Sequence, residues 1–162
     1  MGSKDSKHKP EYADMHLEIP KQEFTAGEVV TGIVHLQVHK KYPARTVCLE
    51  IKGKEKTKWR SHQGSGKKRH LSNHTGENVI LVSRSIILAF PRGEALPGQY
   101  SFPFTFSIPA QMPSSLVYFG PKHSKFTIKY KLTARMEESI DSSQSTLKPV
   151  IAKRRIIIRK TC

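Results

Sequence analysis

Residues 125–135, KFTIKYKLTAR, indicate the fold class because polar and apolar side chains alternate along the stretch. One set of alternate positions carries lysine, threonine and arginine, and the other carries Phe126, Ile128, Tyr130, Leu132 and Ala134. A period of two places successive side chains on opposite faces, as in a β-strand with one buried face. The stretch therefore predicts a strand with an apolar face toward a core and a basic face toward solvent.

The same alternation recurs along most of the chain. We expect strands at 15–19, 30–38, 47–51, 79–90, 100–108 and 150–160. Pro103 has no backbone N–H to donate, so it predicts a sheet edge or a bulge. The best helical segment, 134–145, is weak because no sustained 3.6-residue period with caps is present. Eight or so short strands with turns between them predict an all-β fold, an antiparallel β-sandwich.

Domain organisation follows from where this pattern begins and stops. Residues 1–13 are polar and predict a flexible N-terminal tail, and residues 14–162 predict a single domain. Residues 61–78, SHQGSGKKRHLSNHTGEN, are rich in Gly, Ser and His and predict a mobile loop.

Composition narrows the class of protein further. The chain has 162 residues, and 28 Lys and Arg against 13 Asp and Glu give a net charge of +15. No apolar run reaches the length of a membrane-spanning helix, and residues 1–10 lack the apolar core of a secretory signal. Two cysteines, Cys48 and Cys162, suit a reducing compartment. These features predict a small soluble intracellular domain that attracts anions.

The charge is concentrated on strand faces. Every even position from Lys52 to Arg60 is basic, and an extended chain would place these side chains on one face. The candidate anion-binding residues on the two basic strands are Lys52, Lys54, Lys56, Lys58, Arg60, Lys129 and Lys131. Trp59 lies on the opposite face and is expected in the core, so aromatic stacking on nucleic-acid bases is not favoured. Three alternatives stay open: a solvated face that serves solubility alone, contacts through a strand edge, and a basic β-domain that binds nucleic acid.

Catalytic and metal motifs are not found. The sequence has neither a G-x-S-x-G nor an H-E-x-x-H pattern. His62, His70 and His74 fall in one segment, but no cysteine or close carboxylate cluster completes a zinc ligand set. We therefore expect a protein that is not an enzyme and has no metal and no cofactor.

Several motifs, in order, resemble the N-terminal domain of the arrestin family. Residues 24–32, FTAGEVVTG, resemble the entry to the second strand of that domain, and 96–109, LPGQYSFPFTFSIP, resemble its aromatic strand closed by proline. Residues 113–116 and 128–134 follow at familiar spacing, and 155–160, RIIIRK, resemble its last strand. The turn-like segment 39–45 is most similar to the α-arrestin (arrestin domain-containing) branch or to the retromer subunit that shares the fold.

The resemblance implies an immunoglobulin-like β-sandwich in a non-catalytic cytosolic adaptor. Such proteins bind acidic or phosphorylated cytoplasmic tails of membrane proteins, and also anionic lipids such as phosphoinositides. They act in endocytosis and sorting at the plasma membrane and endosomes. The alternative from the same resemblance is a retromer-type endosomal sorting subunit. The family normally has a second arrestin domain, which is not present in this chain, and any ubiquitin ligase would be recruited through regions outside it.

The resemblance also implies roles for residues outside the two basic strands. Arg159 falls at the position of the buried arginine of the arrestin polar core, and Glu28 is its candidate acidic partner. Lys7 and Lys9 fall near the paired phosphate-sensing lysines, and Lys21 lies beside the position of a first-strand arginine.

Overall fold

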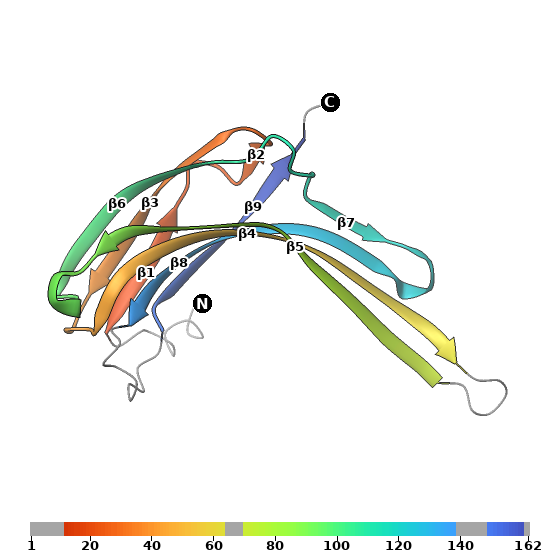
Figure 1. The fold of residues 1–162 in the computed structure, drawn as a ribbon, viewed down its shortest axis with the longest axis horizontal. Coiled ribbons are helices and arrows are strands. Elements are labelled where there is room, and N and C mark those ends of the chain that lie inside the picture. The colour runs from red at the N-terminus through yellow and green to blue at the C-terminus, as the bar shows by residue number, and fades with distance from the viewer. Residues whose placement is uncertain (1–11, 64–69, 139–148, 161–162) are drawn as a thin grey trace, which may run out of the picture.

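Two β-sheets face each other in the computed structural model, which describes residues 12–63, 70–138 and 149–160 (Figure 1). Among the described residues, one sheet has three strands and the other has six. The prediction of an all-β sandwich is confirmed.

The smaller sheet is antiparallel and has the order β1-β3-β6. Its strands are β1 (Ala13–Glu18), β3 (Val29–Val38) and β6 (Gly98–Ser107). In β3 the alternate side chains Val30, Val34, Leu36 and Val38 are buried, because they face the larger sheet. Pro103 lies in β6 opposite Ile33, and β6 is an edge strand, as the missing N–H predicts.

The larger sheet has the order β2-β9-β8-β4-β5, and β7 pairs with the first residues of β8, 125–128. Its strands are β2 (Glu23–Thr25), β4 (Ala44–Gln63), β5 (His70–Ala89), β7 (Leu116–Phe119), β8 (Lys125–Glu138) and β9 (Ile151–Arg159). Two short 3₁₀ turns, η3 (Pro91–Gly93) and η4 (Pro121–His123), connect strands. The pair β2–β9 is parallel, so the sandwich is not wholly antiparallel.

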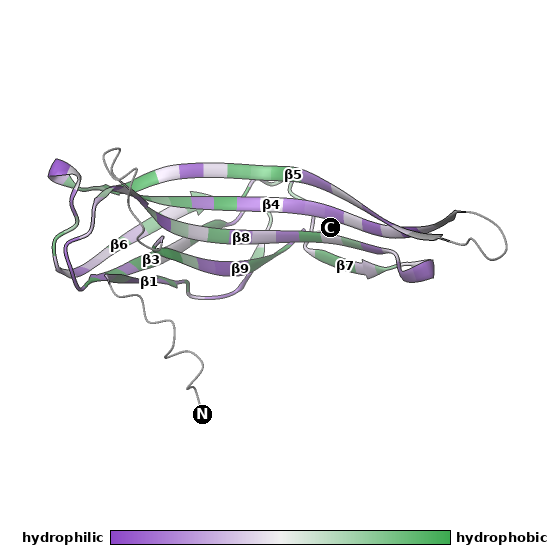
Figure 2. Cartoon of the chain, turned by 90° about the horizontal axis from the view of Figure 1, so that it is seen from below, coloured by the Kyte–Doolittle hydropathy of each residue, from purple (hydrophilic) through white to green (hydrophobic). Residues whose placement is uncertain are grey.

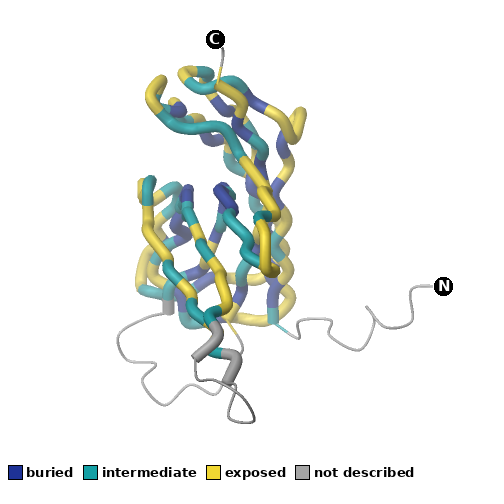
Figure 3. Tube along the Cα trace, turned by 90° about the vertical axis from the view of Figure 1, so that its right-hand side faces the viewer, coloured by how far each residue is buried: buried dark blue, intermediate teal, exposed yellow. Residues whose placement is uncertain are grey.

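The core lies between the sheets. Leu17 and Val34 of the smaller sheet share it with Leu49, Leu132 and Ile156 of the larger one. Buried stretches alternate with exposed ones along the strands (Figure 3). The period of two therefore identifies the inward face correctly.

The strands β4 and β5 are each 20 residues long and project beyond the sandwich as a hairpin (Figure 1). The expected loop at 61–78 is therefore wrong for 61–63 and 70–78, which are strand, while 64–69 lie outside the described residues. Both faces of a projecting hairpin are solvated, so its residues need no apolar alternation. Trp59 is 43% exposed and stacks on His74 with ring centroids 5.2 Å apart, so its expected place in the core is also wrong.

Two segment boundaries also differ from the sequence-based expectation. Ala13 is fully buried and begins β1 opposite Val38, so the expected tail cannot extend to residue 13; residues 1–11 lie outside the described part. Residues 134–138 continue β8 instead of starting a helix, and 139–148 are outside the described part. The described residues contain no helix long and apolar enough to cross a bilayer.

Candidate anion-binding groove

The basic residues of β4, β8 and β9 share the outer face of the larger sheet. The register places Lys52 opposite Lys131, and Lys131 opposite Arg155, so one row of cations crosses three neighbouring strands. Lys54 lies opposite Lys129 in the next row. Directly opposed residues in an antiparallel pair point to the same face, so these side chains are neighbours. The hydrophilic middle of β4 is visible in Figure 2.

These rows line a groove of about 350 Å³, here called the basic groove. Eight of its twelve lining residues are cationic: Lys52, Lys54, Lys56, Lys129, Lys131, Arg135, Lys153 and Arg155. Glu50, Thr127, Tyr130 and Thr133 complete the lining. Like charges directly opposite one another destabilise a sheet. A bound anion would reduce this repulsion between the cations of the groove.

Crowding of the cations affects their protonation. The Arg155 guanidinium lowers the pKa of Lys129 from its ordinary value, and burial and the neighbouring lysines lower it further. Each of these effects disfavours the charged ammonium. A bound phosphate or carboxylate would favour it, so anion binding and protonation of Lys129 support each other.

Few carboxylates neutralise the groove. Glu77 of β5 lies 2.7 Å from the Nζ of Lys54 and 3.9 Å from the Nζ of Lys56. In the described residues no carboxylate forms an ion pair with Lys52, Lys129, Lys131, Lys153 or Arg155. The groove therefore presents several cations to a ligand.

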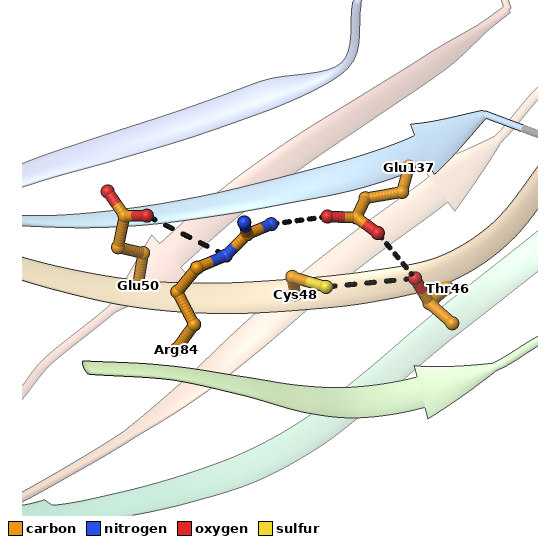
Figure 4. A network of polar contacts seen from close by, with 5 residues as sticks. All are labelled: Thr46, Cys48, Glu50, Arg84 and Glu137. Carbon is orange, nitrogen blue, oxygen red and sulfur yellow. Dashed lines mark hydrogen bonds and ion pairs between the residues drawn. The ribbon is translucent and has the colours of Figure 1, made fainter. Parts of the chain in front are cut away.

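A polar network lies beside the groove and shares Glu50 with its lining (Figure 4). Arg84 of β5 reaches across β4, where its guanidinium pairs with Glu137 and lies 3.7 Å from Glu50. Glu137, whose negative charge is the largest influence, raises the pKa of Arg84. Thr46 donates a hydrogen bond of 3.4 Å to the second Glu137 oxygen, and the Thr46 hydroxyl lies 3.7 Å from the Cys48 sulfur. Arg84 is therefore held over the sheet face.

The structure brings together five of the predicted residues, Lys52, Lys54, Lys56, Lys129 and Lys131, in the basic groove. Lys58 and Arg60 lie farther along the hairpin, where they line a separate hollow with Trp59 and His74. Anion binding by all of these residues stays a prediction. Sequence reasoning did not count Arg135, Lys153 and Arg155 among the candidate anion-binding residues, although it placed Arg135 on the basic face of 125–135. The two-residue spacing of Lys153 and Arg155 within a predicted strand was a usable signal, but their neighbours depend on the register.

The residues suggested by the resemblance lie elsewhere. Arg159 is 67% exposed and pairs with Glu23, so a buried arginine paired with Glu28 is not what forms. β2 runs parallel to β9 and brings Glu23 beside the end of that strand. Glu28 instead accepts hydrogen bonds from Lys21 and from the Thr25 backbone N–H, and these contacts lower its pKa. Lys21 is therefore already paired.

Two of the candidate anion-binding residues lie outside the described residues. Lys7 and Lys9 fall in the undescribed segment 1–11, so nothing is inferred from their surroundings.

The described residues were also searched for a metal site. In the described ranges no three His, Cys, Asp or Glu side chains are placed to hold a metal ion.

Comparison with known proteins identifies the family. Residues 13–159 match the family described as Arrestin (or S-antigen), N-terminal domain, and the chain belongs to this family. The match covers every strand of both sheets. The predicted resemblance is confirmed.

Two curated relatives are arrestin domain-containing proteins. Arrestin domain-containing protein A of Dictyostelium discoideum is 21% identical over 90% of this chain and 26% of its own length. Arrestin domain-containing protein 17 of Caenorhabditis elegans is 27% identical over 68% of this chain and 27% of its own length. The chain therefore spans about a quarter of the length of these relatives.

A solved structure supports the fold alone. The sporulation control protein Spo0M of Bacillus subtilis aligns with 93% of this chain and 50% of its own, with a TM-score of 0.53 and 16% identity. The family match establishes the type of domain. The chemistry of the ligand is inferred from the residues of the basic groove.

Proposed function

We propose that this domain is a non-catalytic adaptor whose basic groove binds an acidic or phosphorylated segment of a membrane protein's cytoplasmic tail. The observation that carries the proposal is the row of Lys52, Lys131 and Arg155 across three strands. Such a row favours a ligand that brings several negative charges at once, because each cation remains crowded by its neighbours.

An extended peptide fits the repeat of the groove. Lysines two residues apart on β4 or β8 lie about 6.6 Å from each other, and an extended peptide repeats its own side chains at the same interval. A phosphate group adds about two negative charges and three acceptor oxygens, so it forms charge-assisted hydrogen bonds with lysine and arginine. A tail with alternating phosphorylated or acidic residues would therefore place successive charges over successive cations.

The site of action follows from the ligand. A domain that binds cytoplasmic tails works in the cytoplasm, at the plasma membrane and endosomes. Phosphoinositide headgroups carry the same phosphate chemistry and are the competing ligand for the groove. Recruitment of a ubiquitin ligase, or assembly as a retromer-type subunit, would depend on parts of a longer protein.

Nucleic acid is the alternative from another class. The groove offers cations for a phosphate backbone, but its one lining aromatic, Tyr130, is fully buried and faces the core. Single-strand binders combine cations with exposed aromatic platforms for the bases. The groove therefore favours a protein tail over RNA.

The test compares three ligands at about 150 mM salt, where long-range attraction is screened. The probes are a multiply phosphorylated tail peptide, phosphoinositide vesicles and single-stranded RNA, and the readout is the dissociation constant of each. We expect the peptide to bind most tightly. Equal binding of all three that disappears as salt rises would overturn the proposal, and vesicle or RNA preference would reassign the ligand.

A double variant assigns the binding to the groove. Lys129→Gln with Lys131→Gln removes two unpaired cations and should weaken peptide binding by about tenfold, since each solvent-exposed ionic contact contributes about 0.7 kcal/mol, a factor of about three. The matched control, Lys41→Gln with Lys122→Gln, removes the same charge away from the groove. Unchanged affinity in the folded groove variant would contradict the assignment.

A further inference from the structure

The strand β5 forms an open edge of the larger sheet. It ends the strand order and pairs with β4 alone. Outside that pairing, the backbone of residues 81–86 forms no hydrogen bond with any described residue. Alternate residues of an edge strand turn their N–H and C=O groups outward, so this stretch offers a template for another strand.

The open stretch is regular and bounded. The register between β4 and β5 shifts at Val47/Cys48 and at Gly53/Lys54, and it skips Ile80 and Ile87 on β5. Between these bulges, Leu81 to Ile86 pair continuously with Gly53 to Cys48. A strand added here would meet six residues of unbroken ladder.

The usual protections of an edge are weak in this stretch. Proteins discourage edge pairing with outward charges or proline. Residues 81–86 read LVSRSI and contain a single charge, Arg84. The Arg84 side chain extends over β4 toward Glu50 and Glu137, away from the free edge (Figure 4). The charge that could block an incoming strand is committed to its own sheet.

The outer face of the edge is apolar. Val82 lies opposite Lys52, and Ile86 opposite Cys48, so both point to the face that carries the basic groove. Val82 is 53% exposed and Ile86 is 65% exposed. Apolar side chains on this face would be covered by alternate side chains of an added strand.

We propose that the edge of β5 from Leu81 to Ile86 binds an extended peptide of a partner protein as an added β-strand. The peptide carries apolar residues four positions apart, opposite Val82 and Ile86, and an acidic residue midway, opposite Arg84. Backbone hydrogen bonds supply the affinity and the apolar pair sets the register, as in other cases of strand addition. The site is separate from the basic groove and goes beyond the proposed function.

Charge selects this occupant over a second copy of the chain. Each copy carries a net charge of +15, so a second copy approaching this edge would be repelled. An acidic peptide meets attraction where a second copy meets repulsion.

The experiment uses a capped peptide with the pattern Thr-Val-Thr-Glu-Thr-Val-Thr, titrated into the ¹⁵N-labelled chain. We expect the largest amide shifts at residues 81–86, with a dissociation constant of about 100 μM to 1 mM for so short a strand. Two further peptides carry N-methyl groups, one on the Val and Glu residues and one on the central Thr residues. Only alternate amides of an added strand point toward β5 and donate hydrogen bonds to it. The peptide in which those amides are methylated should lose at least about tenfold in affinity, and the peptide methylated on the other set should keep its affinity.

Variants separate this site from the groove. Val82→Thr with Ile86→Thr keeps β-branched side chains and should weaken the peptide by about fivefold or more, through lost apolar contact. Lys129→Gln with Lys131→Gln should leave its affinity unchanged while it weakens the phosphopeptide. Equal binding of both N-methylated peptides, shifts centred on the groove, or a dimer whose residues 81–86 are already protected would overturn the proposal.

Discussion

Glu77 of β5 lies beside the basic groove and pairs with two of the lysines that line it. It contacts Lys54 and Lys56, and the hydrogen bond from Lys54 holds its pKa below the ordinary value, so it is ionised at neutral pH. An acidic ligand that reaches Lys54 must compete with Glu77. The residue therefore lowers the affinity of the groove for anions.

Replacing this carboxylate should strengthen ligand binding. We expect Glu77→Gln to raise phosphopeptide affinity about two- to fivefold, because an exposed ion pair contributes at most about 1 kcal/mol. Isothermal titration of the variant measures the change. Glu94→Gln is the matched control, since Glu94 pairs with Lys41 outside the groove. A loss of affinity in Glu77→Gln would show that Glu77 orients the lysines for the ligand.

Single residues also show where sequence reasoning stops. The alternation at 125–135 and at 52–60 predicted which lysines share a face, and the structure agrees. The pairing of Arg159 depends instead on the parallel contact between β2 and β9, which joins residues more than a hundred positions apart. Local periodicity carries no information about which distant strand becomes a neighbour.

At the scale of the element, β4 passes close to β8 where Gly53 lies opposite Tyr130. A Cβ atom at Gly53 would lie 2.6 Å from the Tyr130 ring, which is closer than a carbon contact allows. The ring is fixed, since its hydroxyl donates a 2.6 Å hydrogen bond to the Pro113 carbonyl. Burial raises the pKa of Tyr130 to about 12, so this donor persists at neutral pH. Gly53 therefore sets the spacing beneath Lys52 and Lys54.

Gly53→Ala should destabilise the domain by about 1–3 kcal/mol, because the methyl group overpacks the contact with Tyr130. Urea unfolding followed by circular dichroism measures the difference. Gly76→Ala in β5 is the control, since its nearest neighbour would lie 3.9 Å away. Equal stability of Gly53→Ala and the unmodified chain would mean that β4 and β8 separate easily at this point.

The elements also differ in how far their sequences predict them. The half-buried strands were recognised because one face meets a core. The distal part of the β4–β5 hairpin was not recognised as strand, because it has no buried face. Its residues are stabilised by cross-strand contacts such as the stack of Trp59 on His74. The sequence predicted the part of the basic groove that lies on β4 and β8. It did not predict the contribution of β9, because that strand is placed beside them only by its register with β8.

At the scale of the whole molecule, the larger sheet carries two surfaces with different physics. The basic groove depends on charge, and the edge of β5 depends on backbone hydrogen bonds and apolar contact. Both lie on the same sheet, where β5 is the neighbour of β4. A partner with an acidic segment next to an apolar strand could engage both, and the effective concentration of the second segment would raise its affinity.

Salt should separate the two surfaces. Between about 50 and 500 mM salt the Debye length falls from about 14 Å to about 4 Å, so we expect phosphopeptide binding to weaken at least tenfold. The edge peptide should change less than about threefold, since it carries one charge and binds mainly through its backbone. Titrations at four salt concentrations measure both slopes, and Lys129→Gln with Lys131→Gln should flatten only the first. Equal slopes would mean that the net charge of +15, and not two distinct surfaces, governs both interactions.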